Sequence, residues 1–242
     1  MPSSLPVPLT RAQVVAKYAG AVPTEWGTDV TGVTRRLATT EPVVALTFDA
    51  CGGSGSGYDH ALIATLRRHR VPATLFLNAR WIAANPAIAA DLAGDPLFEL
   101  ANHGTAHRPL SVTGRSAYGI AGTRDPGEAY DEVAGNVAGL HELTGTAPGW
   151  FRTGTAHYDE VATRIVADLG QRVAGFDVNA DAGATRTAEQ VAGAVRAATA
   201  GSIVLAHMNR PAGGTAKGFA AALPELVARL RCVRLSDPVG GR

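Results

Sequence analysis

Short runs of apolar residues alternate with longer segments of helical spacing along most of the chain. The apolar runs predict strands at 43–48, 73–77, 97–101, 150–152, 173–178, 203–206 and 233–235. Between them, apolar residues recur every three or four positions, which predicts helices at 59–69, 86–93, 127–143, 158–169, 187–199 and 217–230. Strands that alternate with helices indicate βαβ units and a parallel sheet. The pattern is that of an α/β protein and fits either a barrel or an open doubly wound sheet.

The first 40 residues carry little pattern apart from a short helix predicted at 11–20. We therefore expect an N-terminal extension at 1–40, one domain at 41–237 and a tail at 238–242. The connection at 108–126 is long enough to be a functional loop. No apolar run reaches the roughly 18 residues of a membrane-spanning helix, so no membrane span is predicted. The N-terminus lacks the basic region and the apolar stretch of a signal peptide.

Polar residues stand where the apolar runs end. They are Asp49, Asn102 with His103, Arg152, Asp177 with Asn179 and Asp181, and His207. In barrels and in open α/β sheets, the chemistry lies at the carboxyl ends of the strands. An acid, an imidazole and a guanidinium at successive strand ends are not expected of random loops, so the pattern predicts an active site at this edge.

One of these polar residues, His103, suggests a metal site together with a second histidine. His103 and His107 are four residues apart, and a helical turn at 104–107 would place both imidazoles on one side, where they can share an ion. The alternative is a pair of surface histidines in a loop. The position directly after a strand favours the metal, and nitrogen ligands joined by an oxygen ligand favour zinc over cobalt, nickel or iron.

The other strand-end residues each have a structural alternative. Asp49 either caps the following turn or lies in a site, which the glycine-rich segment 52–57 would leave accessible to a substrate. Arg152 either packs its stem on Trp150 or pairs with Asp49 or Asp177 and holds a carboxylate ionised. His207 is either a core residue with one satisfied nitrogen or a general acid.

The overall composition excludes several classes of protein. The net charge is +1, from 22 basic and 21 acidic residues, which predicts neither a nucleic-acid partner nor an anionic membrane surface. Cys51 follows the first predicted strand and Cys232 precedes the last, so the two thiols are expected at opposite strand ends and not in a disulfide. Cys51 is then a small apolar residue or a soft metal ligand. The sequence indicates no oligomeric state.

The same residues, in the same order, resemble a known family. T-F-D at 47–49, N-H-x-x-x-H at 102–107, F-R at 151–152, the aspartate segment 176–181 and I-V-L-x-H at 203–207 are similar to the five motifs of the polysaccharide deacetylases. These are the NodB-homology domains of carbohydrate esterase family 4. The resemblance implies a distorted (β/α)7 TIM-like barrel outside the cytoplasm. It also implies metal-dependent hydrolysis of acetyl groups on a carbohydrate polymer or oligosaccharide, such as peptidoglycan or chitin-type N-acetylglucosamine.

The resemblance implies a role for each matching residue. Asp49 corresponds to the catalytic base, His103 and His107 to metal ligands, and His207 to the general acid. The backbone amide of Thr155 corresponds to an oxyanion donor, although Gly154 and Thr155 replace the Pro-Tyr of the motif. An aspartate of the fourth motif is implied to orient Arg152, and the candidates are Asp177 and Asp181.

One departure from the family pattern affects the expected chemistry. The first motif of the family is T-F-D-D, with a metal-binding second aspartate, whereas this chain has Ala50 there, giving T-F-D-A-C. Three outcomes stay open: Asp49 becomes a metal ligand, water or Cys51 fills the position while Asp49 stays the base, or metal binding is lost.

The alternative functions are a non-catalytic glycan-binding relative and hydrolysis of an amide or cyclic imide on the same barrel. Exposed aromatic faces would favour a sugar, since such faces stack on pyranose rings. Tyr58, Trp81 and Tyr158 are the predicted sugar-binding residues.

Overall fold

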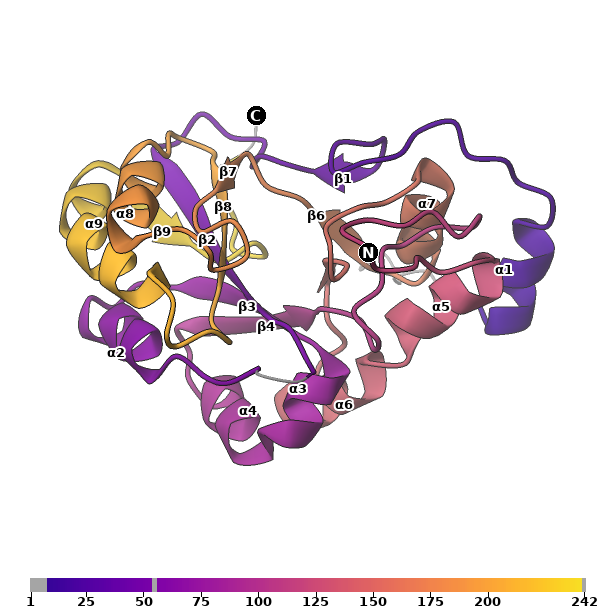
Figure 1. Cartoon of the computed structure of the whole chain (residues 1–242), viewed down its shortest axis with the longest axis horizontal. Coiled ribbons are helices and arrows are strands. Elements are labelled where there is room, and N and C mark those ends of the chain that lie inside the picture. Colours follow the sequence, from indigo (N-terminus) through magenta and orange to yellow (C-terminus); the bar gives the residue numbers. More distant parts are fainter. Residues whose placement is uncertain (1–7, 54–55, 241–242) are drawn as a thin grey trace. The chain divides into compact units, whose positions relative to one another are not determined.

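The computed structural model describes residues 8–53 and 56–240 (Figure 1). The N-terminal residues in which no signal peptide is predicted, part of the glycine-rich segment and the end of the predicted tail lie outside this range. The chain divides into two compact units, each described separately below. Unit 1 is Ala101–Gly175 with the described residues up to Thr34, and unit 2 is Arg35–Leu100 with the described residues from Phe176 onward.

Unit 2 is built around parallel strands in the order β3-β2-β8-β7. These are β3 (Ala73–Leu77), β2 (Val43–Ala50), β8 (Ile203–His207) and β7 (Val178–Asn179), with β9 (Arg231–Val233) pairing with the start of β2. All eight residues of β2 are buried, as expected of a strand covered on both faces. In the register of β2 and β8, Asp49 lies opposite His207. The two strand-end residues predicted to be functional are therefore neighbours.

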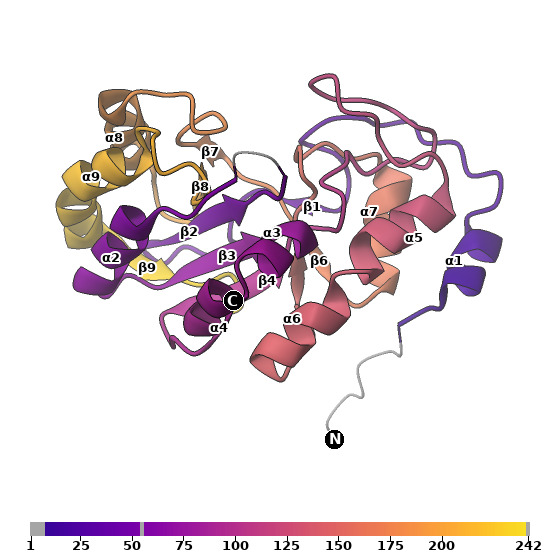
Figure 2. The ribbon, with the colours of Figure 1, turned by 60° about the horizontal axis from the view of Figure 1, so that its bottom comes forward.

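Helices cover the strands of unit 2. They are α2 (His60–Arg68), α3 (Ala79–Ala84), α4 (Pro86–Ala93), α8 (Ala188–Arg196) and α9 (Thr215–Arg229). Helices α8 and α9 lie side by side, as both views show (Figure 1, Figure 2). Their close approach requires Gly218, because a Cβ there would lie 2.5 Å from Val191 Cβ. Phe219 of α9 packs on Phe48 of β2 with ring centroids 5.0 Å apart, which joins the helices to the strands.

Unit 1 contains shorter strands and four helices. The strands pair in parallel in the order β1-β6-β5-β4 and are β1 (Val33–Thr34), β6 (Arg172–Ala174), β5 (Trp150–Phe151) and β4 (Phe98–Asn102), the last of which begins in unit 2. The helices are α1 (Arg11–Lys17), α5 (Pro126–Ala134), α6 (Val137–Thr144) and α7 (Glu160–Asp168). Helix α1 and helix α7 both pack against α5.

Most of the elements lie where the sequence predicts them, with several differences. The two-residue strand β1 was not predicted, and the strand predicted at 173–178 is divided into β6 and β7. The segment 127–143 forms two helices, because Gly135 ends α5 and Asn136 begins α6. Asn102 Nδ2 donates a 2.8 Å hydrogen bond to the Val133 carbonyl at this break and so competes with a continuing helix. The short helix α3, capped by Asn78, was not predicted. The start predicted at Thr187 is confirmed by a capping box with Gln190.

Cys51 and Cys232 are not joined in a disulfide, as predicted. Cys232 pairs with Val44 near the start of β2, whereas Cys51 follows the end of that strand. Burial raises the pKa of the Cys232 thiol to about 12, so this residue behaves as a small apolar side chain. Within the described parts of the chain, every helix is too short or too polar to cross a bilayer.

Candidate active site

In unit 1, the two histidines of the H-x-x-x-H motif lie next to each other after β4. Their rings meet edge to face with centroids 5.1 Å apart. The segment between them is not the predicted helical turn, since Gly104 has φ 72° and His107 has φ 61°. The left-handed backbone at these two residues brings the rings together by a different route from the one expected.

The nitrogen atoms of the two rings are positioned as metal ligands require. His103 is fully buried, and its Nδ1 lies 2.8 Å from the Arg152 carbonyl oxygen. A carbonyl oxygen only accepts, so Nδ1 carries the proton and Nε2 keeps a lone pair. His107 Nε2 is buried, and none of the described residues gives it a hydrogen-bond partner. Buried polar atoms are rarely left in this state, and a divalent ion would satisfy it.

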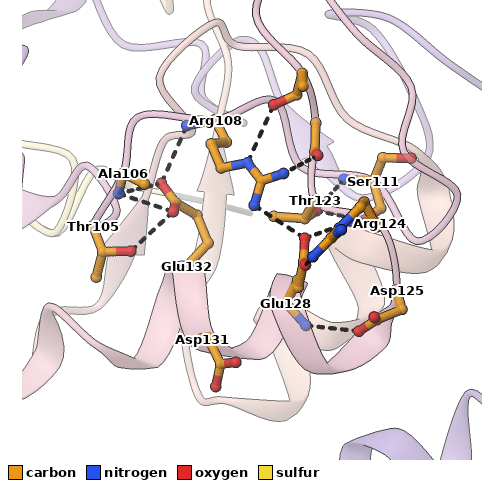
Figure 3. A network of polar contacts seen from close by, with 12 residues as sticks. Thr105, Ala106, Arg108, Ser111, Thr123, Arg124, Asp125, Glu128, Asp131 and Glu132 are labelled. Carbon is orange, nitrogen blue, oxygen red and sulfur yellow. Dashed lines mark hydrogen bonds and ion pairs between the residues drawn. The ribbon is translucent and has the colours of Figure 1, made fainter.

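A buried carboxylate holds the backbone between the two histidines (Figure 3). Glu132 of α5 is 3 % exposed and accepts hydrogen bonds from Thr105 Oγ1 and the Ala106 amide, both at 2.9 Å, and from the Arg108 amide at 3.3 Å. A Cβ at position 104 would lie 2.4 Å from Glu132 Oε1, so Gly104 is required for this approach. The sequence did not identify Glu132 as a site residue, because nothing in its helical context marks it as a partner of residues that precede it by 24 to 27 positions.

Arg152 is fully buried at the end of β5. Its guanidinium donates to the Ala174 carbonyl at 3.2 Å and to the Gly175 carbonyl at 2.9 Å. Its own backbone carbonyl is the group that orients His103. Gly154 follows closely, and a Cβ there would lie 2.4 Å from His107 Cγ. The replacement of the family's proline by glycine at this position thus makes room for the His107 ring.

In unit 2, His207 is held by a buried aspartate. Asp181 accepts from His207 Nδ1 at 2.8 Å, from the His207 amide at 2.7 Å and from Thr215 Oγ1 at 2.9 Å. Burial alone would lower the pKa of His207, but the hydrogen bonds to Asp181 and Cys51 and the charges of Asp181 and Asp49 raise it well above 6.5. This shift favours the protonated imidazole, which is the form that a general acid requires.

A comparison with protein families decides what this arrangement belongs to. A family model described as polysaccharide deacetylase matches residues 36–174, more than half of the 242 residues. The chain belongs to the polysaccharide deacetylase family. No curated protein sequence is a significant match.

Solved structures of the same family share the fold. A pseudoenzyme of carbohydrate esterase family 4 from Bacillus anthracis is 20 % identical with a TM-score of 0.71, over 84 % of this chain and 67 % of that chain. A peptidoglycan N-acetylglucosamine deacetylase is 19 % identical with a TM-score of 0.72, over 87 % and 94 %. A family 4 acetyl xylan esterase from Clostridium thermocellum, solved with a cobalt ion, is 22 % identical with a TM-score of 0.64, over 80 % and 89 %.

These similarities confirm the predicted fold class, the α/β barrel of the NodB-homology type. A divalent metal is general in polysaccharide deacetylases, and the two oriented imidazoles of unit 1 fit one. The predicted domain limits at 41 and 237 stay a prediction.

The two aspartates predicted as candidates to orient the motif arginine have different contacts within unit 2. Asp177 and Asp181 were the candidates for orienting Arg152. The Asp177 carboxylate pairs with Arg36 and accepts from Ser202 Oγ at 2.9 Å and from the Ile203 amide at 2.8 Å. Asp177 therefore anchors the edge of β8 in this structure. The other fourth-motif candidate, Asp181, orients His207. Both are aspartates beside a strand end, so sequence alone did not separate their roles.

Two of the three aromatic residues predicted to bind sugar are buried. Trp81 is 1 % exposed and donates from its indole nitrogen to the Gly57 carbonyl at 2.8 Å. Tyr158 is 0 % exposed, and its hydroxyl accepts from the Thr153 amide at 2.9 Å. Neither side chain has a face open to a pyranose ring, and we assign both a structural role. Tyr58 is partly exposed and packs on His60, with ring centroids 4.4 Å apart.

Proposed function

We propose that the chain is a metal-dependent deacetylase that removes acetyl groups from a glycan such as peptidoglycan or chitin-type N-acetylglucosamine. The observation that carries the proposal is the state of the two motif histidines. The Arg152 carbonyl fixes the tautomer of His103, and His107 Nε2 is a buried nitrogen without a hydrogen-bond partner among the described residues. The first feature leaves a lone pair on His103 Nε2, and the second is a buried nitrogen that a metal ion would satisfy. Solvated surface histidines require neither feature.

The proposed ligands are His103 and His107, and zinc is the favoured ion. Zinc bound there would polarise the acetyl carbonyl and lower the pKa of a bound water molecule toward neutrality. Asp49 is 4 % exposed at the end of β2, and we assign it the proton from the attacking water or a place among the ligands. We assign to the Arg152 guanidinium the role of keeping the Asp49 carboxylate ionised. We assign to the Thr155 amide the role of donating a hydrogen bond to the oxyanion.

His207 is the proposed general acid. The raised pKa favours the protonated imidazole, and in the proposed step the proton moves from the ring to the departing amine nitrogen. The Nδ1–H is committed to Asp181, so the proton that leaves is the one on Nε2. After the transfer, the same aspartate holds the ring in the tautomer that is ready to be protonated again.

The experiment combines elemental analysis with acetate release from an N-acetylglucosamine oligomer and from peptidoglycan fragments. We expect bound zinc in the purified protein, and loss of acetate release in the His103→Ala variant and after chelation. His141→Ala, which removes an exposed histidine of α6, is the matched control and should retain activity. Full activity of the His103→Ala variant, or of chelated protein, would refute the metal role.

A non-catalytic glycan-binding role is the second candidate. It is favoured by Ala50, which removes the carboxylate of the T-F-D-D motif, and by similarity to a family pseudoenzyme. A protein of this kind would bind the oligomer without zinc and release no acetate. For either function, we propose a location outside the cytoplasm, where peptidoglycan and chitin-type polymers are found.

A further inference from the structure

A group of aromatic rings lies on the surface of unit 1, outside the family motifs. Tyr118 is 81 % exposed at the tip of the long segment between β4 and α5. Its ring meets His157 edge to face at a centroid distance of 5.1 Å, and His157 lies 5.9 Å from Trp26. The guanidinium of Arg115 stands over Trp26, 5.7 Å from the ring centroid. Together these four residues, named here the aromatic surface, combine ring faces with hydrogen-bond donors.

The turn that carries Tyr118 has an unusual backbone. Ala117 and Ile120 exchange two backbone hydrogen bonds, of 3.1 and 2.9 Å, around a two-residue turn. Both residues of that turn have positive φ, 53° for Tyr118 and 75° for Gly119. A left-handed conformation is unfavourable for a large side chain, and Asn or Gly is the usual choice there. A tyrosine in this place, open to solvent, points to binding.

The segment around the turn is ordered by its own contacts (Figure 3). The Arg108 guanidinium donates to the carbonyls of Ala121 at 3.2 Å and Gly122 at 2.6 Å, and to Glu128 of α5 at 3.0 Å. The two arms of the segment are also joined to each other, since the Ser111 amide donates to Thr123 Oγ1 at 2.8 Å. Because these bonds fix the segment without a ligand, binding on Tyr118 would not have to order it first.

The aromatic surface is connected to the motif arginine segment. His157 Nδ1 donates to the Thr155 carbonyl oxygen at 2.8 Å, and Thr155 is the proposed oxyanion residue. The His157 carbonyl accepts from the Leu110 amide at 3.0 Å, at the start of the long segment. His157 therefore contacts both Tyr118 and Thr155. A sugar on Tyr118 lies next to the part of unit 1 that carries the proposed chemistry.

We infer that Tyr118, with His157, Trp26 and Arg115, forms a subsite for a pyranose ring of the glycan chain beyond the residue that is deacetylated. The inference rests on the proposed function. The C–H face of a pyranose carries partial positive charge and suits the electron-rich face of a tyrosine ring. The guanidinium of Arg115 offers donors to the ring hydroxyls. We assign sugar binding to this surface in place of the predicted residues Trp81 and Tyr158, which are buried.

The test measures binding and turnover of a chitin-type hexamer and dimer. Binding is measured by calorimetry with the full chain in chelator, and turnover by acetate release with zinc. Tyr118→Ala should raise the Kd for the hexamer roughly 2- to 12-fold, the range expected for loss of one aromatic contact. The effect on the dimer should be smaller, since a dimer spans fewer subsites. Tyr118→Phe keeps the ring and should restore most of the affinity.

Ile120→Ala is the matched control, because it changes a side chain of the same turn and removes no aromatic ring. A hexamer affinity and KM in Tyr118→Ala equal to those of the unaltered protein would overturn the inference and leave the proposed deacetylase intact. Hexamer binding that depends on Tyr118, without acetate release from any substrate, would support the subsite and overturn the proposed activity. An equal loss in Ile120→Ala would overturn the role of the ring.

Discussion

Removal of the Glu132 carboxylate tests whether α5 positions the two motif histidines. Two of its hydrogen bonds are short, to Thr105 Oγ1 and the Ala106 amide, both at 2.9 Å. A hydrogen bond to a charged acceptor contributes about 1.5–3 kcal/mol to stability. Because water can replace part of that contribution when it reaches the donor, we take a loss of about 1–2 kcal/mol for each of these two bonds. Ala106 is exposed and Thr105 half-buried, so we expect Glu132→Ala to lower the free energy of unfolding by about 2–4 kcal/mol.

The decisive measurement is zinc affinity. The carboxylate holds the backbone between His103 and His107, and loss of such outer support typically costs 10–100-fold in metal affinity. We expect that range for Glu132→Ala in competition with a chromophoric chelator. A smaller loss is expected for Glu132→Gln, which keeps one acceptor oxygen. Thermal unfolding of the metal-free protein should show a Tm lower by roughly 4–16 °C for the alanine variant.

The neighbouring Asp131 supplies the control. Its side chain is 53 % exposed and pairs with Arg11 at 2.9 Å, so Asp131→Asn should change stability by about 1 kcal/mol or less and leave zinc affinity unaltered. If Glu132→Ala lowers the Tm but binds zinc as tightly as the unaltered protein, Glu132 supports the helix alone and the positioning argument is wrong.

Three further changes test other parts of the site. Asp181 helps to raise the pKa of His207, and a general acid works only while it is protonated, so activity should fall as pH rises through that pKa. The Asp181→Asn variant should show this alkaline fall at lower pH. An unchanged kcat–pH profile would contradict the role of the Asp181–His207 pair. Gly104→Ala should destabilise by at least about 1–2 kcal/mol from its φ of 72°, and should weaken zinc binding by displacing Glu132, as denaturant unfolding and zinc titration would show. Ala50→Asp should lower the Tm of the metal-free protein, because a carboxylate enters a buried position, and should tighten zinc binding; unchanged affinity by calorimetry would show that position 50 is no ligand position.

The elements of the fold were largely predictable because they follow from local periodicity. The buried β-branched run at 43–48 and the apolar run at 203–206 became β2 and β8, and their polar ends, Asp49 and His207, became register partners. Helix α3 was missed because six residues are too few to show a period. The break between α5 and α6 depends on Asn102, a partner more than thirty residues away.

The contacts that tune the site were not predictable from spacing. Asp177 and Asp181 stand four residues apart at the same sheet edge, yet the first binds Arg36 and the second binds His207. The choice depends on side-chain direction and on the distant Ser202 and Thr215 hydroxyls. The aromatic residues raise the same difficulty. Burial of Trp81 and exposure of Tyr118 are properties of the packed chain, and both are ordinary aromatic residues in the sequence.

The departures of this chain from the family motifs in unit 1 have local structural reasons. Gly104 stands at the hydroxyl position of the second motif, where any Cβ would meet Glu132, and Gly154 stands at the proline position of the third, where a Cβ would meet His107. In each case the glycine makes room for a group that holds or forms part of the histidine pair. We therefore interpret these two glycines as requirements of the packing around the histidine pair, whereas Ala50 leaves the first motif without its second carboxylate.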